Sequence, residues 1–347
     1  MLPCYIPRVP GELPARTEVA ILGGGFAGCA TAWALAARGI SAVVLEGAPA
    51  LGAYASGRGA GLGRQLAADD ATTALTVAGA AVLRGELAHA WRATGGILGF
   101  DDPAQAAAYT ARAARFGVAV HAITRGDVLA RWPSLDALPL AAALSVPDDG
   151  VIDVQALLAT YASAAQVELA THVTAVEAGR VTTSRGPIAA RVIVDATGAW
   201  AGQLVGATPL DAFKRHIFIV EGASTPDTPY LWHLGARELY VRGASDGVLV
   251  SPCDADITMP ADQEPSPDAD ARLRGVLDPV ASPLASARIV RRWACQRAFT
   301  PERTMRLGRD PSRPWLVWAA GLGGHGATAS AAVGRVVAAA VIDALAA

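Results

Sequence analysis

Residues 17–46 decide the fold, and they read TEVAILGGGFAGCATAWALAARGISAVVLE. The apolar run 17–22 ends in glycines, as a buried parallel strand does. Helix-forming residues follow at 26–38, and a second apolar run, 41–45, ends at Glu46. This order predicts a strand, a glycine turn, a helix and a second strand that closes on an acid.

The glycines of this turn match the pattern GxGxxG, with Gly23, Gly25 and Gly28 in the three places. The first glycine permits the tight turn, the second leaves room for a pyrophosphate, and the third lets helix and strand pack closely. Glu46 stands about twenty residues further on, where an acid binds a ribose hydroxyl. A glycine turn without a ligand is the alternative, but the full strand–helix–strand context favours a dinucleotide site.

Two later segments favour FAD over a nicotinamide cofactor. Residues 195–200, DATGAW, follow an apolar strand, and residues 321–328, GLGGHGAT, form a second glycine-rich turn that opens a helix. A second helix N-terminus aimed at the cofactor stabilises negative charge on a reduced flavin. A simple nicotinamide dehydrogenase needs neither segment.

Size and composition narrow the class of protein. The 347 residues are too many for one core, so we expect two interlocked domains. Hydrophobic residues make up 52% and charged residues 17%, which excludes a disordered chain. The net charge of −2 gives no electrostatic footprint for nucleic acid or for an acidic membrane, so neither is expected as a partner.

The two ends of the chain and the metal-binding residue types give further expectations. The alanine-rich tail 327–347 is predicted to be a helix packed on the domain, not a transmembrane segment. Prolines interrupt residues 1–14 where a signal peptide needs an unbroken apolar core, so we expect a cytoplasmic protein. The histidines lack metal-binding spacing and no CxxC pair occurs, so no metal is predicted; the cysteines are Cys4, Cys29, Cys253 and Cys295.

The remaining elements follow from periodicity and from turn residues. A turn is expected over 148–154, an exposed proline-rich loop over 258–267, and breaks at Gly79 and Gly85 within a helical stretch. Further strands are expected over 167–176, 180–183, 191–194, 213–221, 238–251 and 315–320, and further helices over 72–93, 155–165 and 268–277.

With these motifs in place, the chain resembles the D-amino-acid oxidase (DAO) superfamily of FAD-dependent oxidoreductases. The resemblance covers nearly the whole chain, and it is closest to bacterial D-arginine dehydrogenase, with glycine oxidase and sarcosine oxidase as other members. The segments that carry it, in the family's order, are GGGFAG, ASGRGAG at 55–61, PDDGVID at 147–153, DATGAW and GLGGHGAT.

The resemblance implies an α/β fold with two domains. A discontinuous, Rossmann-like FAD-binding domain would comprise residues 1–90, 145–210 and 290–347. An α+β substrate-binding domain, built on a mixed β-sheet, would comprise residues 91–144 and 211–289.

The resemblance also implies a set of residues that contact FAD. Arg58 is expected along the flavin, with pairing to a carboxylate at the domain interface as the alternative. His325 would act either through a side-chain hydrogen bond to the flavin or through its backbone. The residues expected at the pyrophosphate are Gly23, Gly25, Phe26, Ala27 and Gly28, with Glu46 at the ribose and Val173 near adenine. Those expected along the flavin are Ser56, Gly57, Arg58 and Gly61, and those near the middle of FAD are Ala196, Gly198 and Trp200. Those expected to border the isoalloxazine and ribityl chain are Gly323, Gly324, His325, Gly326 and Thr328.

The implied substrate site lies between the mixed sheet and the flavin. Arg297 stands where the family carries the arginine that clamps the substrate carboxylate, and a buried guanidinium needs an anionic partner. Tyr240 is expected at the same carboxylate, or as a half-buried strand aromatic. The catalytic set is completed by His325 and Arg215, with His216 as the alternative to Arg215.

Two departures from the family pattern leave the substrate open. The chain has Cys295, Gln296 and Arg297 where the dehydrogenases have a Gly-Leu-Arg type of segment. The segment after Gly61, LGRQ, lacks the tyrosine that D-arginine dehydrogenase carries there. Sarcosine oxidase joins a matching cysteine to its flavin, so Cys295 offers a covalent bond, although a non-covalent FAD is favoured.

The implied function is oxidation of a small amine or amino acid by hydride transfer to flavin N5, giving an imine. The amino acid would be of the D-, glycine or N-methyl type, its carboxylate would be held by the site, and an unidentified acceptor would take the electrons. The single lysine, Lys214, does not match the lysine that helps oxygen react in sarcosine oxidases, which favours a dehydrogenase. The alternatives are a 2-hydroxy acid dehydrogenase, a flavin domain in tRNA modification, and an FAD-binding protein without turnover.

Overall fold

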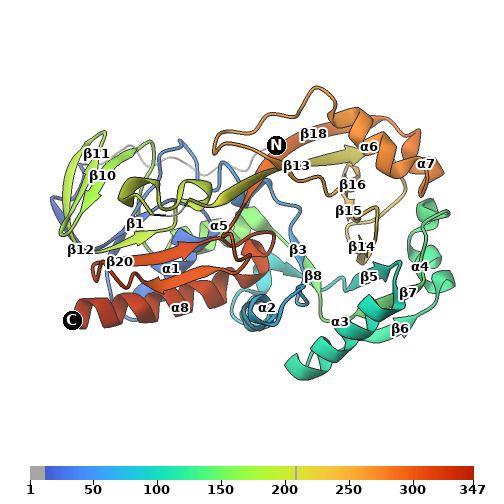
Figure 1. Cartoon of the computed structure of the whole chain (residues 1–347), viewed down its shortest axis with the longest axis horizontal. Helices are drawn as coiled ribbons and strands as arrows, with labels where there is room; N and C mark the ends of the chain where they lie inside the picture. Colours follow the sequence, from blue (N-terminus) through green and yellow to red (C-terminus); the bar gives the residue numbers. More distant parts are fainter. Residues whose placement is uncertain (1–11, 208) are drawn as a thin grey trace.

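The computed structural model describes residues 12–207 and 209–347. Cys4 and most of the proline-rich start of the chain lie outside these residues. The described chain forms two large β-sheets, a small three-stranded sheet and eight α-helices (Figure 1).

The predicted strand–glycine turn–helix–strand unit is confirmed. β1 (Arg16–Leu22) leads through the glycines into α1 (Phe26–Ala36), and β2 (Ala42–Leu45) pairs with β1 in parallel. The branched apolar residues of both strands are buried, which is why this part of the chain reads as continuous apolar runs. The same sheet adds β9 (Gln166–Glu168), β10 (Val173–Glu177), β11 (Arg180–Thr183), β12 (Gly186–Asp195), β19 (Arg306–Arg309) and β20 (Leu316–Ala320).

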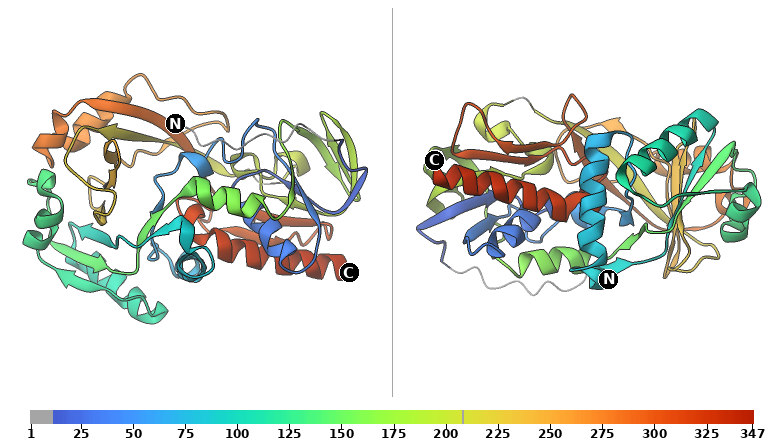
Figure 2. Two further views of the ribbon diagram at one scale, coloured as in Figure 1. Left: turned by 180° about the vertical axis from the view of Figure 1, so that it is seen from behind. Right: turned by 90° about the horizontal axis from the view of Figure 1, so that it is seen from below.

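Three helices pack together around α1. The C-terminal helix α8 (Gly326–Ala346) contacts α1 along its length, and α2 (Asp70–Arg84) crosses α8 near its N-terminal end (Figure 2). α5 (Val154–Ala162) covers another side of α1. By length and composition α8 is apolar enough to span a membrane, and half of that apolar stretch is buried inside the protein. The prediction of a tail helix packed on the domain is confirmed.

The second sheet is mixed, as expected. Its strands run in the order β17 (Asp256–Ile257), β13 (Asp211–Val220), β16 (Gly247–Ser251), β15 (Leu239–Ala244), β14 (Tyr230–Leu234), β5 (Gly96–Phe100), β7 (Ala142–Val146) and β6 (His121–Ile123), and β18 (Ile289–Phe299) pairs with β13. β14 and β5 are parallel and the other pairs are antiparallel.

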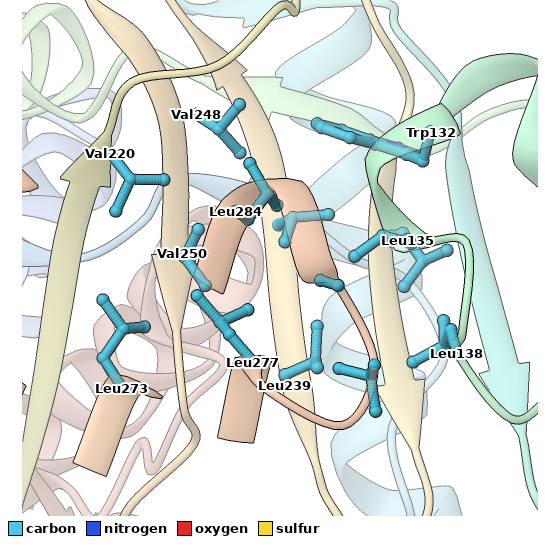
Figure 3. Packing of buried hydrophobic residues seen from close by; sticks show 14 of the residues in the cluster. Trp132, Leu135, Leu138, Val220, Leu239, Val248, Val250, Leu273, Leu277 and Leu284 are labelled. Atoms are coloured by element: carbon cyan, nitrogen blue, oxygen red, sulfur yellow. The ribbon is translucent and has the colours of Figure 1, made fainter. Parts of the chain in front are cut away.

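Helices cover the second sheet on the side away from α1. Leu273, Leu277 and Leu284 pack against Val248 and Val250 of the sheet (Figure 3). These leucines lie on α6 (Ala269–Leu277) and α7 (Ser282–Ala285), and the remaining helices of this part are α3 (Pro103–Phe116) and α4 (Arg125–Arg131). The short third sheet consists of β3 (Leu62–Gly63), β8 (Gly150–Ile152) and β4 (Trp91–Arg92), and single 3₁₀ turns occur at Ser56–Arg58, Ala88–Ala90, Pro133–Leu135, Gly198–Trp200 and Gln203–Val205.

Some expected elements differ from the structure. The helix expected over 72–93 ends at Arg84, and Gly79 lies inside it without breaking it. The expected strand 167–176 is split into β9 and β10, because Ala170 between them has a φ of 49°. The expected strand 238–251 is a hairpin of β15 and β16, and the turn expected over 148–154 contains β8.

The division of the strands between the two large sheets is similar to the expected division of the chain into domains. Every strand of the first sheet lies in 1–90, 145–210 or 290–347. β18 falls almost entirely in the last of these segments, yet it pairs with β13 in the second sheet. The polypeptide therefore passes from the second sheet into the first along β18, which positions residues of both sheets around one cavity.

Candidate active site

A cavity of about 610 Å³ is lined by residues of both large sheets. The first sheet contributes the glycine turn after β1 and the segments that follow β2, β12 and β20. The second sheet contributes side chains of β13, β14, β15 and β18. Within the described part of the chain, no cluster of three or more histidine, cysteine or acidic side chains is arranged to hold a metal ion.

The three glycines of the first turn have different structural roles. A Cβ on Gly28 would lie 2.0 Å from the carbonyl oxygen of Gly23, and Gly23 itself has a φ of 102°. These two positions therefore need glycine for the turn and for close helix–strand packing. A Cβ on Gly25 would meet only the hydroxyl oxygen of Ser56, at 3.0 Å, and Gly25 lines the cavity. Gly25 is thus the position where the backbone is open to a ligand.

Glu46 is fixed at the edge of the cavity by backbone hydrogen bonds. Its Oε2 accepts from the Gly24 N–H at 2.7 Å and its Oε1 from the Ala48 N–H at 2.8 Å. Burial raises the pKa of this carboxyl, while the two hydrogen bonds act in the opposite direction. A carboxylate offers about four acceptor sites, so lone pairs remain on both oxygens for ribose hydroxyls.

Two helix N-termini meet this cavity, and neither has a side-chain cap from its own N-cap residue. α1 begins after Gly25 and α8 after His325, and the residues of both first turns line the cavity. α2, α3, α4 and α5 are capped by Asp69, Asp102, Thr124 and Asp153, whereas α6 and α7 are uncapped but do not line the cavity. Because helix N-termini attract anions, this pair of open ends fits a cofactor with a pyrophosphate and a flavin that becomes negative when reduced.

Arg297 and Tyr240 present hydrogen-bond donors to the same cavity. Arg297 lies on β18 opposite Phe213, and its guanidinium packs where a Cβ of Gly324 would be, 3.0 Å from Nη1. Burial, and then repulsion by Arg215, lower its pKa, and no ion pair or hydrogen bond involves it within the described residues. Burial raises the pKa of Tyr240 to about 12, so this phenol is neutral, and its buried hydroxyl has no partner among the described residues.

His325 contacts a residue that sequence reasoning missed. The Arg64 guanidinium lies 3.7 Å above the Trp232 ring, and its Nη2 donates to His325 Nε2 at 3.2 Å. Burial, and then the charges of Arg64 and Arg297, hold the pKa of His325 well below its usual range. His325 is therefore neutral, with its proton on Nδ1, because an arginine can only donate to Nε2. The sequence does contain a signal for Arg64: it is an arginine within the mostly apolar segment GLGRQLA, and arginine is rarely buried without a partner.

Most of the predicted site residues line the cavity. They are Gly23, Gly25, Phe26, Ala27, Glu46, Ser56, Gly61, Val173, Ala196, Gly198, Trp200, Tyr240, Arg297, Gly323, Gly324, His325, Gly326 and Thr328. Gly28 and Gly57 do not line it; both are packed against backbone, Gly57 with a Cβ position 3.0 Å from the Gly52 carbonyl oxygen.

Two arginines lie elsewhere than expected. Arg58 pairs with Asp262 at 2.6 Å and donates to the Gln263 carbonyl, so its alternative interpretation, a partner on a neighbouring loop, describes the structure better. Arg215 is buried behind the cavity wall, where its Nε and Nη2 donate to the carbonyls of Asp254 and Cys253. Neither side chain lines the cavity. Asp262 and a carbonyl hold Arg58, and two carbonyls hold Arg215, whose buried Nη1 has no partner among the described residues.

The sequence profile of the DAO family, described as FAD dependent oxidoreductase, matches residues 18–340. The chain belongs to the DAO family of FAD-dependent oxidoreductases. This confirms the predicted family, the α/β fold and the enzyme class, and the family implies FAD as the cofactor. The residues that would hold FAD line the cavity at the two helix N-termini.

Several solved structures share this fold. L-proline dehydrogenase from P. horikoshii superposes with a TM-score of 0.86 at 24% identity, over 94% of this chain and 93% of that one. Glycine oxidase from Geobacillus kaustophilus gives 0.81 at 24% identity, over 95% of both chains. L-amino acid deaminase from Proteus myxofaciens superposes with a TM-score of 0.82 at 19% identity, over 98% of this chain and 93% of that one. A search of curated protein sequences finds no match to this DAO-family chain.

Proposed function

We propose that this DAO-family enzyme oxidises a small amino acid whose carboxylate is held by Arg297. The observation that carries the proposal is that Arg297 and Tyr240 line the same cavity as the glycine-rich turns. Among the described residues, neither the guanidinium nor the hydroxyl has a hydrogen-bond partner. A planar guanidinium binds a carboxylate through two parallel hydrogen bonds, which fixes orientation as well as charge. The Tyr240 hydroxyl would donate a third hydrogen bond to the same carboxylate.

FAD, when bound, would supply the acceptor for a hydride from the substrate Cα–H. A neutral amine would thereby become an iminium, which water hydrolyses to a keto acid and ammonia or an amine. The chain's own residues orient the Cα–H by holding the carboxylate, which supplies proximity. Among the lining residues Glu46 is the sole acid, and it lies at the glycine turn. With neutral His325 beside two arginines, the site repels a cationic amine and favours its unprotonated form.

The proposed substrates are a D-amino acid, glycine or an N-methyl amino acid. The structural neighbours named above are an L-proline dehydrogenase, a glycine oxidase and an L-amino acid deaminase, so both enantiomers belong in the test. A 2-hydroxy acid is the second candidate, because the carboxylate clamp of Arg297 and Tyr240 would hold it equally well. Anaerobic addition of each compound to the flavoprotein, followed by flavin absorption, separates these classes.

We propose a dehydrogenase and not an efficient oxidase. Lys214 donates to the Glu264 carbonyl at 3.0 Å and does not line the cavity, so no ammonium group stands there to stabilise superoxide. Peroxide formation in air should be slow beside the reduction of an artificial acceptor. Equal rates would make the enzyme an oxidase.

We also propose that FAD is bound without a covalent bond. Cys295 lines the cavity, but burial raises the pKa of its thiol, which disfavours the nucleophilic thiolate. Acid precipitation should leave the yellow colour in the supernatant, whereas colour retained in the pellet would show a thioether.

A further inference from the structure

Two arginines line the cavity without an ion pair among the described residues, and the proposed function uses only one of them. Arg297 comes from β18, and Arg64 comes directly after β3. The Arg64 side chain is 7% exposed, and its Nε has no hydrogen-bond partner within the described residues. A buried guanidinium without an anion is costly, so Arg64 needs a partner as much as Arg297 does.

Contacts, and on one side the electrostatic interaction between Tyr240 and Arg297, connect the two guanidinium groups into a ring around the cavity wall. Arg297 packs against Gly324, and the next residue, His325, accepts a hydrogen bond from Arg64 at 3.2 Å. On the other side, Arg64 stacks on Trp232 at 3.7 Å, and Trp232 packs on Tyr240 with ring centroids 5.2 Å apart. The aromatic pair therefore lies between the two arginines, which places them at different points of the wall.

The ring carries two positive charges and no negative one. Its remaining members are glycine, a neutral histidine, tryptophan and a neutral tyrosine. The nearby carboxylates are committed elsewhere. Glu238 accepts from the Trp232 indole at 2.7 Å, and Asp149 accepts from Gln65 at 3.0 Å and from Tyr230 at 2.5 Å. Asp149 lies close enough for its charge to interact with Arg64, but neither Asp149 nor Glu238 forms an ion pair or hydrogen bond with that guanidinium among the described residues. A single carboxylate on Arg297 would therefore leave Arg64 without an ion-pair partner.

We infer that the substrate carries a second anionic group, and that it is an amino dicarboxylate. Its α-carboxylate binds Arg297 and Tyr240, and its second carboxylate binds Arg64 across the Trp232–Tyr240 pair. This inference rests on the proposed function for the α-carboxylate. It adds Arg64 as the residue that determines which side chain the site accepts.

The test uses ligands that cannot be oxidised, so that it does not depend on turnover. Malonate, succinate and glutarate are titrated into the FAD-loaded enzyme beside acetate, propionate and butyrate, and binding is followed by the change in the flavin absorption spectrum. A charge-assisted hydrogen bond contributes enough that the best dicarboxylate should bind at least ~10-fold more tightly than its monocarboxylate counterpart. Equal dissociation constants for the two series would overturn the inference.

Variants of Arg64 assign the second anion to this side chain. Arg64→Gln should bring the ratio of the two dissociation constants close to one, and Arg64→Lys should restore part of it. Arg292→Gln is the matched control, since Arg292 lies on β18 but pairs with Asp270 at the surface. If Arg64→Gln weakens both series by the same factor, Arg64 shares the carboxylate of Arg297 and the inference is wrong. If Arg64→Gln loses its flavin, Arg64→Lys decides instead, and a ratio close to one in Arg64→Lys would also contradict the inference.

Failure of this inference can be told apart from failure of the proposed function. If neutral amino acids reduce the flavin but the two ligand series bind equally, only the second anion is wrong. If the dicarboxylates bind tightly but no amino acid reduces the flavin, the proposed oxidation is wrong.

Discussion

At the scale of single residues, the site depends on which positions are open to the cavity. Gly25 and Arg297 are the two positions at which the proposed function depends on a single residue. Gly25 would leave room for the cofactor at the backbone, and Arg297 would supply the positive charge for the substrate. Each gives a prediction that can be checked with one variant and one control.

Gly25→Val should abolish FAD binding without unfolding the protein. The new side chain would extend from a Cβ already 3.0 Å from Ser56 Oγ into the cavity and displace a pyrophosphate. Flavin absorbance per mole of purified protein measures this. Gly275→Val, at an exposed helical position with no atom within 4 Å of the Cβ, is the control and should keep its flavin. Full flavin retention in Gly25→Val would refute the assignment of the glycine turn.

Arg297→Ala should keep fold and FAD but lose at least ~30-fold in kcat/KM, because truncating a buried, hydrogen-bonded charge pair costs about 2–5 kcal/mol. Tyr240→Phe should lose less, since it removes one hydroxyl contact to the same carboxylate. Arg292→Ala, on the same strand but paired with Asp270, should stay near the wild-type value. Near wild-type kcat/KM in Arg297→Ala would place the clamp elsewhere.

At the scale of elements, local patterns were predictable from the sequence and long-range contacts were not. The turn from Gly23 to Gly28 and the position of Glu46 follow from short spacings, so they could be read directly. Arg64 was missed because its environment is made by Trp232 and His325, which reach it only through the folding of two sheets. The glycines beside Arg58 favour a position along the flavin, but the Arg58 side chain instead forms an ion pair with Asp262 on a neighbouring loop.

Gly79 shows the same limit within a helix. The sequence suggested a break, because glycine is a poor helix former, whereas the structure uses Gly79 to bring α2 against α8. A Cβ there would lie 2.0 Å from the Thr328 carbonyl oxygen, in the first turn of α8. Residue type alone does not distinguish a helix break from a close helix crossing.

Gly79→Ala should therefore destabilise the protein by roughly 1–3 kcal/mol, the usual range for overpacking. The displaced first turn of α8 should also weaken FAD binding. Gly275→Ala, exposed on α6, should instead raise the stability slightly, because alanine loses less conformational freedom on folding. The melting temperatures of both variants decide this, and an unchanged value for Gly79→Ala would contradict the crossing.

At the scale of the whole molecule, a buried carboxyl joins the small third sheet to the second large sheet. Asp149, just before β8, accepts hydrogen bonds from Gln65, which follows β3, and from Tyr230 on β14. Burial raises the pKa of Asp149 to about 6. The folded state therefore holds this proton more tightly than the unfolded state does.

This carboxyl gives stability a definite pH dependence. Its contribution is fully present below the unfolded pKa of 3.8 and is lost as the pH rises through about 6. Relative to Asp149→Asn, which does not titrate, the free energy of unfolding of the wild type should fall by about 1 kcal/mol between about pH 5 and about pH 7. Urea unfolding of both proteins measures the difference. A gap that is constant or grows with pH would contradict the buried, proton-holding role.

We propose that residues of both large sheets hold the substrate, with its carboxylate on Arg297, beside a flavin held at the two helix N-termini. Anaerobic titration of the purified flavoprotein with D- and L-amino acids, N-methyl amino acids and 2-hydroxy acids tests it most directly, with flavin absorbance as the readout. We expect at least one amino acid to bleach the oxidised flavin in the wild-type enzyme, and the same compound to bleach Arg297→Ala far more slowly. Bleaching by 2-hydroxy acids alone, or by no compound in the panel, would contradict it.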